Sequence, residues 1–143
     1  MKFITYFFSV FVLCCYSFGA PEEEEDRVYE RFYDNGQLQI RGMFIAGEME
    51  GVWEDFHENG QLRTRGTYIV GRKTGPWESF YSNGQRQGRG TLQSGRQQGL
   101  EERYYESGQL LSRGTFKDGQ FDGLWEAFYS NGKLISRTTY RDG

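Results

Sequence analysis

The chain has 143 residues, among them 20 glycines, 12 phenylalanines, 10 tyrosines and 3 tryptophans, but 2 prolines and 2 cysteines. This length allows one domain or a short array of repeats. Branched aliphatic residues are too few to fill a doubly wound α/β fold or a helical bundle, and the glycine content disfavours long helices. The composition therefore indicates an all-β chain that is rich in turns and aromatic side chains.

The first residues have the pattern of a secretory signal peptide. Lys2 precedes an uncharged, largely apolar run over residues 3–18, which is shorter than the roughly 20 residues that span a bilayer. The small residues Ser17 and Gly19 favour cleavage after Gly19. We therefore expect residues 1–19 to be a signal peptide and the rest of the chain to be exported, to the periplasm or outside the cell.

Two alternatives to a cleaved signal stay open. Cys14 and Cys15 lie inside this run, directly after the apolar residues that end at Leu13, so one of them could carry a lipid anchor. An uncleaved anchor is the other alternative. No cysteine lies beyond Cys15. The exported part therefore has no disulfide, no zinc site built from thiolates and no cysteine nucleophile.

Five consecutive acidic residues, 22–26, follow the signal. Such a block repels itself and stays solvated, so residues 20–28 are predicted to form an acidic, disordered linker. The remaining residues, 27–143, contain sixteen Lys and Arg against fifteen Asp and Glu. A nearly neutral domain offers no electrostatic basis for binding nucleic acid.

A period of 24 residues organises residues 29–143 into about five units. The recurring dipeptides are Asn35-Gly36, Asn59-Gly60, Asn83-Gly84, Ser107-Gly108 and Asn131-Gly132. Two further glycine series keep the same spacing: Gly47, Gly71, Gly95, Gly119 and Gly143, and Gly51, Gly75, Gly99 and Gly123. Because glycine and asparagine adopt the positive φ of tight turns, each unit is predicted to be a β-hairpin.

Asn-Gly favours a two-residue type I′ turn. In the second unit this turn pairs Glu58 with Gln61, His57 with Leu62 and Phe56 with Arg63. It also places a Glu opposite an Arg in every unit, which supports the register: Glu30–Arg41, Glu54–Arg65, Glu78–Arg89, Glu102–Arg113 and Glu126–Arg137. These pairs are predicted to be structural, because a slipped register would separate them.

Alternation along the strands places Trp53, Leu62 and Tyr68 on one face and Glu54 and Arg63 on the other. Neither face is wholly apolar. We therefore expect one elongated, single-layer antiparallel sheet of about ten strands, in which aromatic side chains pack between neighbouring hairpins.

The fourth unit departs from the pattern. Glu101 stands in a Trp position, Leu92 in an aromatic position and Arg86 in a Leu position. One interpretation is a locally loosened stretch of sheet. The other is a polar contact patch that carries Arg86, Arg89, Arg96 and Arg103.

Residues 66–77 read G-x-Y-x-x-G-x-x-x-G-x-W, and Gly114, Phe116, Gly119, Gly123 and Trp125 repeat this spacing. Together with Phe80-Tyr81-Ser82-Asn83-Gly84, the pattern resembles the MORN repeat, in the variant of the bacterial YwqK-type antitoxin-like proteins. The resemblance implies elongated single-layer sheets of stacked hairpins. It also implies a scaffolding or binding role, with phospholipid or protein contacts. An antitoxin-like role is a further alternative that rests on the family's name alone.

Catalytic chemistry has little support. His57, the one histidine, occupies a position held by Tyr in the other units, so it is predicted to be a substituted aromatic residue. We found no nucleophile elbow, phosphate-binding loop or dinucleotide fingerprint, and the recurring Glu residues have Arg partners. We therefore predict a protein that is not an enzyme and has no metal or other cofactor.

Three binding functions remain. The first is a protein-binding scaffold at the cell envelope, with self-association through the last predicted strand, residues 133–140, which has no successor in the sequence. The second is a module that binds membrane phospholipid, and the third is a module that binds cell-wall glycan. The candidate binding residues on an aromatic face are Trp53, Tyr68, Trp77, Tyr81, Tyr105, Trp125 and Tyr129.

Overall fold

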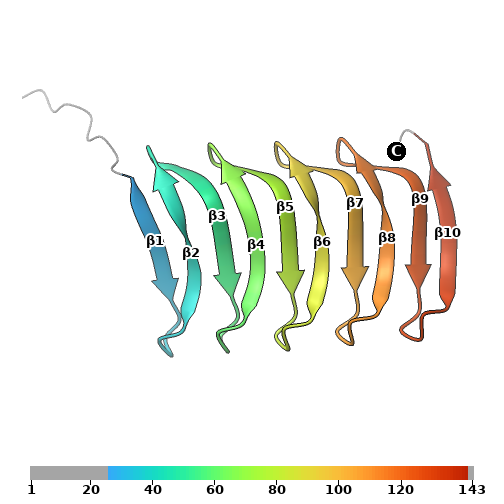
Figure 1. The fold of residues 1–143 in the computed structure, drawn as a ribbon, viewed down its shortest axis with the longest axis horizontal. Helices are drawn as coiled ribbons and strands as arrows, with labels where there is room; N and C mark the ends of the chain where they lie inside the picture. Colours follow the sequence, from blue (N-terminus) through green and yellow to red (C-terminus); the bar gives the residue numbers. More distant parts are fainter. Residues whose placement is uncertain (1–25, 142–143) are drawn as a thin grey trace, which may run out of the picture.

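The computed structural model describes residues 26–141 as ten strands in a single antiparallel sheet (Figure 1). Each strand pairs with its neighbours in sequence order, so the sheet is a row of hairpins added side by side. The predicted all-β, elongated, single-layer sheet is confirmed. The predicted signal peptide lies outside the described residues, and the first strand begins at Arg27, two residues before the predicted start of the repeats.

The strands have nearly equal lengths, and they alternate between an outgoing and a return strand of each hairpin. Their bounds are β1 Arg27–Phe32, β2 Leu38–Ile45, β3 Glu48–Phe56, β4 Leu62–Ile69, β5 Arg72–Phe80, β6 Arg86–Gln93, β7 Arg96–Tyr104, β8 Leu110–Lys117, β9 Gln120–Phe128 and β10 Leu134–Tyr140.

The loop inside each hairpin has three residues and not two. In the second hairpin, the backbone N–H of His57 donates to the carbonyl of Gln61, and the N–H of Gly60 donates to the carbonyl of His57. Gly60 has a φ of +82°, whereas Asn59 is not among the residues with positive φ. This is a type I turn closed by a left-handed glycine, so the predicted type I′ turn at Asn59-Gly60 is wrong.

A bulge in the return strand absorbs the extra loop residue. Phe56 lies opposite Leu62 and Asp55 lies opposite Thr64, which leaves Arg63 without a cross-strand partner. Leu62 therefore shares the face of Phe56, while the Arg63 side chain reaches Asp55 with an N–O distance of 3.1 Å. The predicted faces of Leu62 and Arg63 are thus exchanged, because alternation stops at a bulge.

The loop and the bulge each shift the register by one residue, and the two shifts cancel. Beyond the bulge, Glu54 stands opposite Arg65 and Trp53 stands opposite Gly66, in the register that the sequence predicts. The predicted pairs between the bulge and the loop are wrong: Glu58–Gln61, His57–Leu62 and Phe56–Arg63.

Type I′ turns are present, but they join successive hairpins. Ala46 and Gly47 connect β2 to β3, with φ values of 47° and 78°. A two-residue connection with positive φ at both positions is a type I′ turn. The same turn recurs at Val70-Gly71, Ser94-Gly95 and Asp118-Gly119.

The sheet has very little hydrophobic core. Among the described residues, the buried apolar side chains are Trp53, which is 5% exposed, and Phe116, which is 8% exposed. Both belong to clusters of aromatic rings on one side of the sheet, which we call the aromatic face. The first cluster has ring-centroid distances of 5.1–6.1 Å and the second of 4.5–5.3 Å; they comprise Tyr29, Phe44, Trp53 and Tyr68, and Phe116, Phe121, Trp125 and Tyr140.

Each cluster is seated on a glycine of the neighbouring strand. A Cβ atom at Gly42 would lie 2.2 Å from Cδ2 of Trp53, and one at Gly114 would lie 2.3 Å from Cδ2 of Trp125. The indole rings therefore lie directly on bare backbone. The absence of a side chain at these positions is what lets the rings be buried, although residues 26–141 form no second layer over the sheet.

This packing predicts that Gly42→Ala destabilises the protein by about 2 kcal/mol, because the methyl group and the Trp53 ring need the same space. Urea denaturation of both proteins measures the change. Gly88→Ala is the matched control: Gly88 also lacks a positive φ, and its nearest atom would be Cδ of Arg103 at 3.3 Å. Equal losses in the two variants would contradict the packing argument.

Candidate functional site

The opposite side of the sheet carries a row of alternating charges, which we call the ladder. Each strand contributes one residue, and each Glu stands opposite the Arg of every adjacent strand. The ladder consists of Glu30, Arg41, Glu54, Arg65, Glu78, Arg89, Glu102, Arg113, Glu126 and Arg137. The sequence predicted the pairs inside each hairpin. Side-by-side addition of hairpins supplies the pairs between them, which the 24-residue period could have indicated.

Near the two ends of the ladder, one carboxylate accepts hydrogen bonds from two guanidinium groups. Glu54 pairs with Arg41 at 2.7 Å and with Arg65 at 3.0 Å. Glu126 pairs with Arg113 at 2.8 Å and with Arg137 at 2.7 Å. Hydrogen bonds from Arg113 and Arg137 lower the pKa of Glu126. These carboxylates are buried, and the guanidinium groups supply the charge and donors that a buried carboxylate requires.

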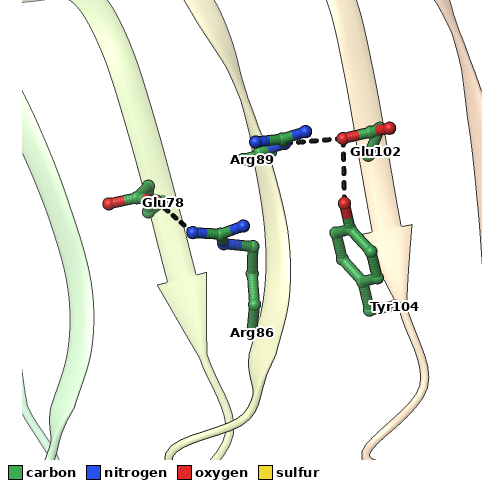
Figure 2. A network of polar contacts seen from close by, with 5 residues as sticks. All are labelled: Glu78, Arg86, Arg89, Glu102 and Tyr104. Carbon is green, nitrogen blue, oxygen red and sulfur yellow. Dashed lines mark hydrogen bonds and ion pairs between the residues drawn. The ribbon is translucent and has the colours of Figure 1, made fainter. Parts of the chain in front are cut away.

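The ladder is interrupted at Glu78. Register places Glu78 between Arg65 and Arg89, yet Arg65 pairs with Glu54 and Arg89 pairs with Glu102 at 2.6 Å. Glu78 instead pairs with Arg86 of β6 at 2.9 Å (Figure 2).

Arg86 explains the interruption. It occupies the position that Leu38, Leu62, Leu110 and Leu134 hold in the other hairpins, where the side chain lies opposite the aromatic residue of the outgoing strand. From there its guanidinium reaches Glu78. The Nε atom of Arg86 is buried and has no hydrogen-bond partner in the described part of the chain, which is a cost of placing Arg in a Leu position.

Tyr104 completes this polar cluster. It stands in a Phe position, and its hydroxyl donates to Glu102 at 2.8 Å (Figure 2). Burial raises the pKa of Glu102, but hydrogen bonds from Tyr104 and Arg89 outweigh burial and lower it overall. Burial and the bond to Glu102 raise the pKa of Tyr104, and the bond to Glu102 raises the pKa of Arg89. The sequence singled out Arg86 and Arg89 but missed Tyr104, although its Phe-to-Tyr change was visible in the repeat.

The four arginines of the predicted polar patch do not lie together. Arg86 and Arg89 belong to the ladder side (Figure 2). Arg103 is on the aromatic face, where it lies over the ring of Trp77 at 5.5 Å. Arg96 is the first residue of β7, beside the turn at Ser94-Gly95.

Glu101 interrupts the aromatic face in the same hairpin. It stands in a Trp position and is 5% exposed, and its carboxylate accepts hydrogen bonds from Gln97 at 2.5 Å and Arg103 at 2.7 Å. Strands β6, β7 and β8 nevertheless stay paired throughout. The fourth unit therefore replaces ring packing with a satisfied polar cluster, and its strands are not separated.

The seven predicted aromatic binding residues are also divided. Trp53 and Tyr68 are in the first ring cluster and Trp125 is in the second, while Trp77 lies between the clusters under Arg103. The remaining three form a separate row beside the three-residue loops: Tyr81, Tyr105 and Tyr129.

That row connects each hairpin to the next. The hydroxyls of Tyr33, Tyr81 and Tyr105 donate to backbone carbonyls of the following hairpin at 2.7–2.9 Å, and His57 Nε2 makes the equivalent contact with Phe80 at 2.9 Å. His57 thus replaces a tyrosine in the interface between hairpins. The amide groups of the loop asparagines make a second such link; they belong to Asn35, Asn59 and Asn83.

A stripe of small and apolar side chains runs beside the ladder, and sequence analysis did not identify it. Its outgoing-strand members recur every 24 residues: Val28, Val52, Pro76, Leu100 and Leu124. The stripe borders a hollow of about 500 Å³ whose walls include Val52, Pro76 and Leu100, with Arg65 and Arg89 along one side. Val52 and Leu100 are each 54% exposed, so apolar surface is accessible here.

Between residues 26 and 141, no three His, Cys, Asp or Glu residues are placed to hold a metal ion. The same part of the chain contains no helix that could cross a membrane. The hollow is lined by aliphatic residues, threonines, glycines, Trp77 and charged residues that already have partners. It is suited to contact with another molecule.

Comparison with protein families finds five matches to the family described as MORN repeat variant. They cover residues 28–46, 49–69, 73–93, 97–118 and 121–142, one match for each hairpin. No curated protein matches the chain.

We expect Arg86→Leu to raise the free energy of unfolding by about 1 kcal/mol, because the orphaned Nε disappears and Glu78 regains access to Arg65 and Arg89. Urea denaturation measures the change. The reciprocal variant Leu62→Arg, in a hairpin without the cluster, should lose a similar amount. A less stable Arg86→Leu protein would mean that the Arg86–Glu78 pair is itself a net source of stability.

Tyr104→Phe should lower stability at neutral pH by about 1 kcal/mol, because Glu102 loses a donor. A carboxyl whose pKa is lowered by folding stabilises the protein above its unfolded-state pKa, and this contribution is lost as pH falls through the folded-state pKa. The deficit of Tyr104→Phe should therefore shrink as pH falls into that range. Chemical denaturation between pH 7 and pH 3 measures it.

Tyr29→Phe is the control for this series, because the Tyr29 hydroxyl makes no hydrogen bond to a described residue. Its effect on stability should not change across the same pH range. A deficit of Tyr104→Phe that is constant down to pH 3 would show that the hydroxyl does not act on the ionised form of Glu102.

Proposed function

We propose that this chain, which belongs to the MORN repeat variant family, is an exported, non-enzymatic scaffold that binds a protein partner at the cell envelope. MORN repeats are in general modules for protein or membrane interaction. The observation that carries the choice of a protein partner is the accessible apolar stripe that borders the ladder.

The stripe has the spacing of an extended peptide. Val52, Pro76 and Leu100 lie on every second strand, so neighbouring members are about 9.6 Å apart. Three residues of a polyproline II helix make one turn and cover about 9 Å, so every third side chain points the same way. A partner segment that crosses the strands could therefore place an apolar side chain at every third residue against the stripe, while the half-exposed ladder arginines offer donors to its carbonyl groups.

Electrostatics favours a protein over an anionic membrane. Positive and negative residues nearly balance over residues 27–143, and the ladder arginines that flank the hollow, Arg65 and Arg89, already pair with carboxylates. Binding to anionic lipid depends on an excess of basic residues near the surface. A phospholipid-binding module is therefore the weaker alternative.

Glycan binding is the other alternative. It would use aromatic rings as platforms for sugars, and Trp53 and Trp125 are engaged in the ring clusters and lie on backbone. The Trp77 ring lies under the guanidinium group of Arg103. The antitoxin role rests on a family name alone, and export of the chain argues against it, because an intracellular toxin would not be met outside.

Export rests on the apolar run at residues 3–18, which precedes the described part of the chain. A stack of nearest-neighbour hairpins with several kinds of side-chain link between them suits a scaffold, since it keeps a long surface in register without a cofactor.

The decisive experiment is crosslinking and affinity capture from the envelope of the producing cell, with the full chain expressed under its own leader. The wild-type chain should recover a partner protein, and Val52→Glu combined with Leu100→Glu should recover about tenfold less or worse, because two carboxylates would be buried in the interface. Val70→Glu, which changes an exposed apolar residue in a turn, should behave as wild type.

Three results would contradict the proposal. One is capture that is unchanged in the double variant. The second is recovery of the chain only in the cytosol with residues 1–19 intact. The third is a different ligand: salt-sensitive flotation with anionic vesicles would indicate lipid, and retention on peptidoglycan that is lost in Trp77→Ala would indicate glycan.

A further inference from the structure

The two edges of the sheet are the two halves of an interface that occurs four times inside it. Return strands β2, β4, β6 and β8 each pair with the next outgoing strand. Among the described residues, β10 is a return strand that pairs with β9 alone, and β1 is an outgoing strand that pairs with β2 alone (Figure 1).

Three kinds of polar contact characterise the internal interface, and in each of them the donor group belongs to the earlier hairpin. An Arg of the return strand pairs with a Glu of the next strand, as Arg41 does with Glu54 at 2.7 Å. A Tyr or His beside the loop donates to a carbonyl 23 residues later. An Asn of the loop also donates to a carbonyl 23 residues later.

The last hairpin carries the complete donor set. By the 24-residue period, its donors are Arg137, Tyr129 and Asn131. Tyr129 is 55% exposed, and neither its hydroxyl nor the Asn131 amide donates to a residue of the described chain. Arg137 contacts Glu126 of its own hairpin, as Arg65 contacts Glu54.

The first hairpin carries the complete acceptor set. The corresponding positions are the Glu30 carboxylate and the carbonyls of Phe32 and Asp34. Glu30 is exposed and forms no ion pair with any described residue. Of the four internal acceptors of the same kind, three pair with an Arg of the preceding hairpin: Glu54, Glu102 and Glu126. The exception is Glu78, which pairs with Arg86.

The aromatic face is complementary as well. Phe44 meets Trp53 edge to face at 5.1 Å, and Phe116 meets Trp125 at 5.3 Å, in each case between one hairpin strand and the next. The equivalent residues at the two edges are Tyr140 of β10 and Tyr29 of β1. Polar and aromatic contacts therefore specify one register between the edges.

We propose that β10 of one molecule pairs antiparallel with β1 of a second copy, with Arg137 opposite Glu30, so that the sheet continues from one molecule into the next. The contact joins two different surfaces and leaves a free β10 and a free β1 at the ends. A heterologous contact forms a ring only if successive copies rotate back onto the first. The hairpins of one molecule form a nearly straight row (Figure 1), so the same contact repeated between molecules builds linear chains with increasing concentration. This goes beyond the proposed function, since a partner on the stripe is compatible with single molecules and with chains.

Charge reversal tests the register. Sedimentation velocity of the full chain over a range of concentrations should show growing linear species for the wild type. Arg137→Glu and Glu30→Arg should each weaken association about tenfold or more, because like charges then face each other. Glu58→Arg, which makes the same charge change in an exposed loop, should associate as wild type.

Mixing the two reversed variants separates the proposal from a general loss of stability. The carboxylate introduced by Arg137→Glu in one molecule then faces the guanidinium introduced by Glu30→Arg in the other. The equimolar mixture should therefore recover association that neither variant has alone. Circular dichroism and urea denaturation check that each variant is folded. A wild type that stays monomeric, single variants that associate normally, or a mixture that does not recover would each overturn the proposal.

Discussion

Every hairpin of this protein depends on the hairpin beside it, because within residues 26–141 no second layer covers the sheet. Two apolar side chains, Trp53 and Phe116, are buried in the described residues, far fewer than a two-layer domain buries. Stability therefore comes from contacts between neighbours: rings on bare glycine backbone, guanidinium groups on carboxylates, and loop side chains on the next loop. A protein of this kind is well described by a sum over adjacent units.

The ladder shows how buried charge is tolerated in a thin sheet. A buried carboxylate such as that of Glu126 loses much of its hydration. Two arginines from the adjacent strands supply the hydrogen bonds that water would otherwise donate. Isolated surface pairs contribute about 0–1 kcal/mol each, so the row adds less to stability than its length suggests. Its larger effect is on register, because any slip of one strand would leave buried carboxylates without partners.

The fourth hairpin shows that departures from the repeat are correlated. Arg86 in a Leu position draws Glu78 out of the ladder, and Tyr104 in a Phe position gives Glu102 a donor. On the other face Glu101 replaces an indole, and Gln97 and Arg103 satisfy its carboxylate. Each polar replacement thus brings its own partners, and the sheet remains continuous while its surface chemistry changes in the middle of the strip.

The sequence by itself determined the number of hairpins, their order and the Glu–Arg register away from the loops. The reason is that a 24-residue period repeats the turn glycines and the paired Glu and Arg positions along the chain. The sequence did not determine the turn types. Asn-Gly fits both a two-residue loop and a three-residue loop, and a bulge at a position such as Arg63 restores the same distant register in the second case.

Tertiary structure alone decided which candidate residues share a surface. The sequence grouped Arg86 with Arg103 and Trp53 with Tyr81, but the bulges and the two faces separate them. The tertiary structure also decided that Glu78 pairs with Arg86, although Arg65 and Arg89 stand opposite Glu78 in the sheet. The physical reason is that side-chain pairing depends on which neighbour a flexible guanidinium reaches in three dimensions, and residue spacing does not specify that choice.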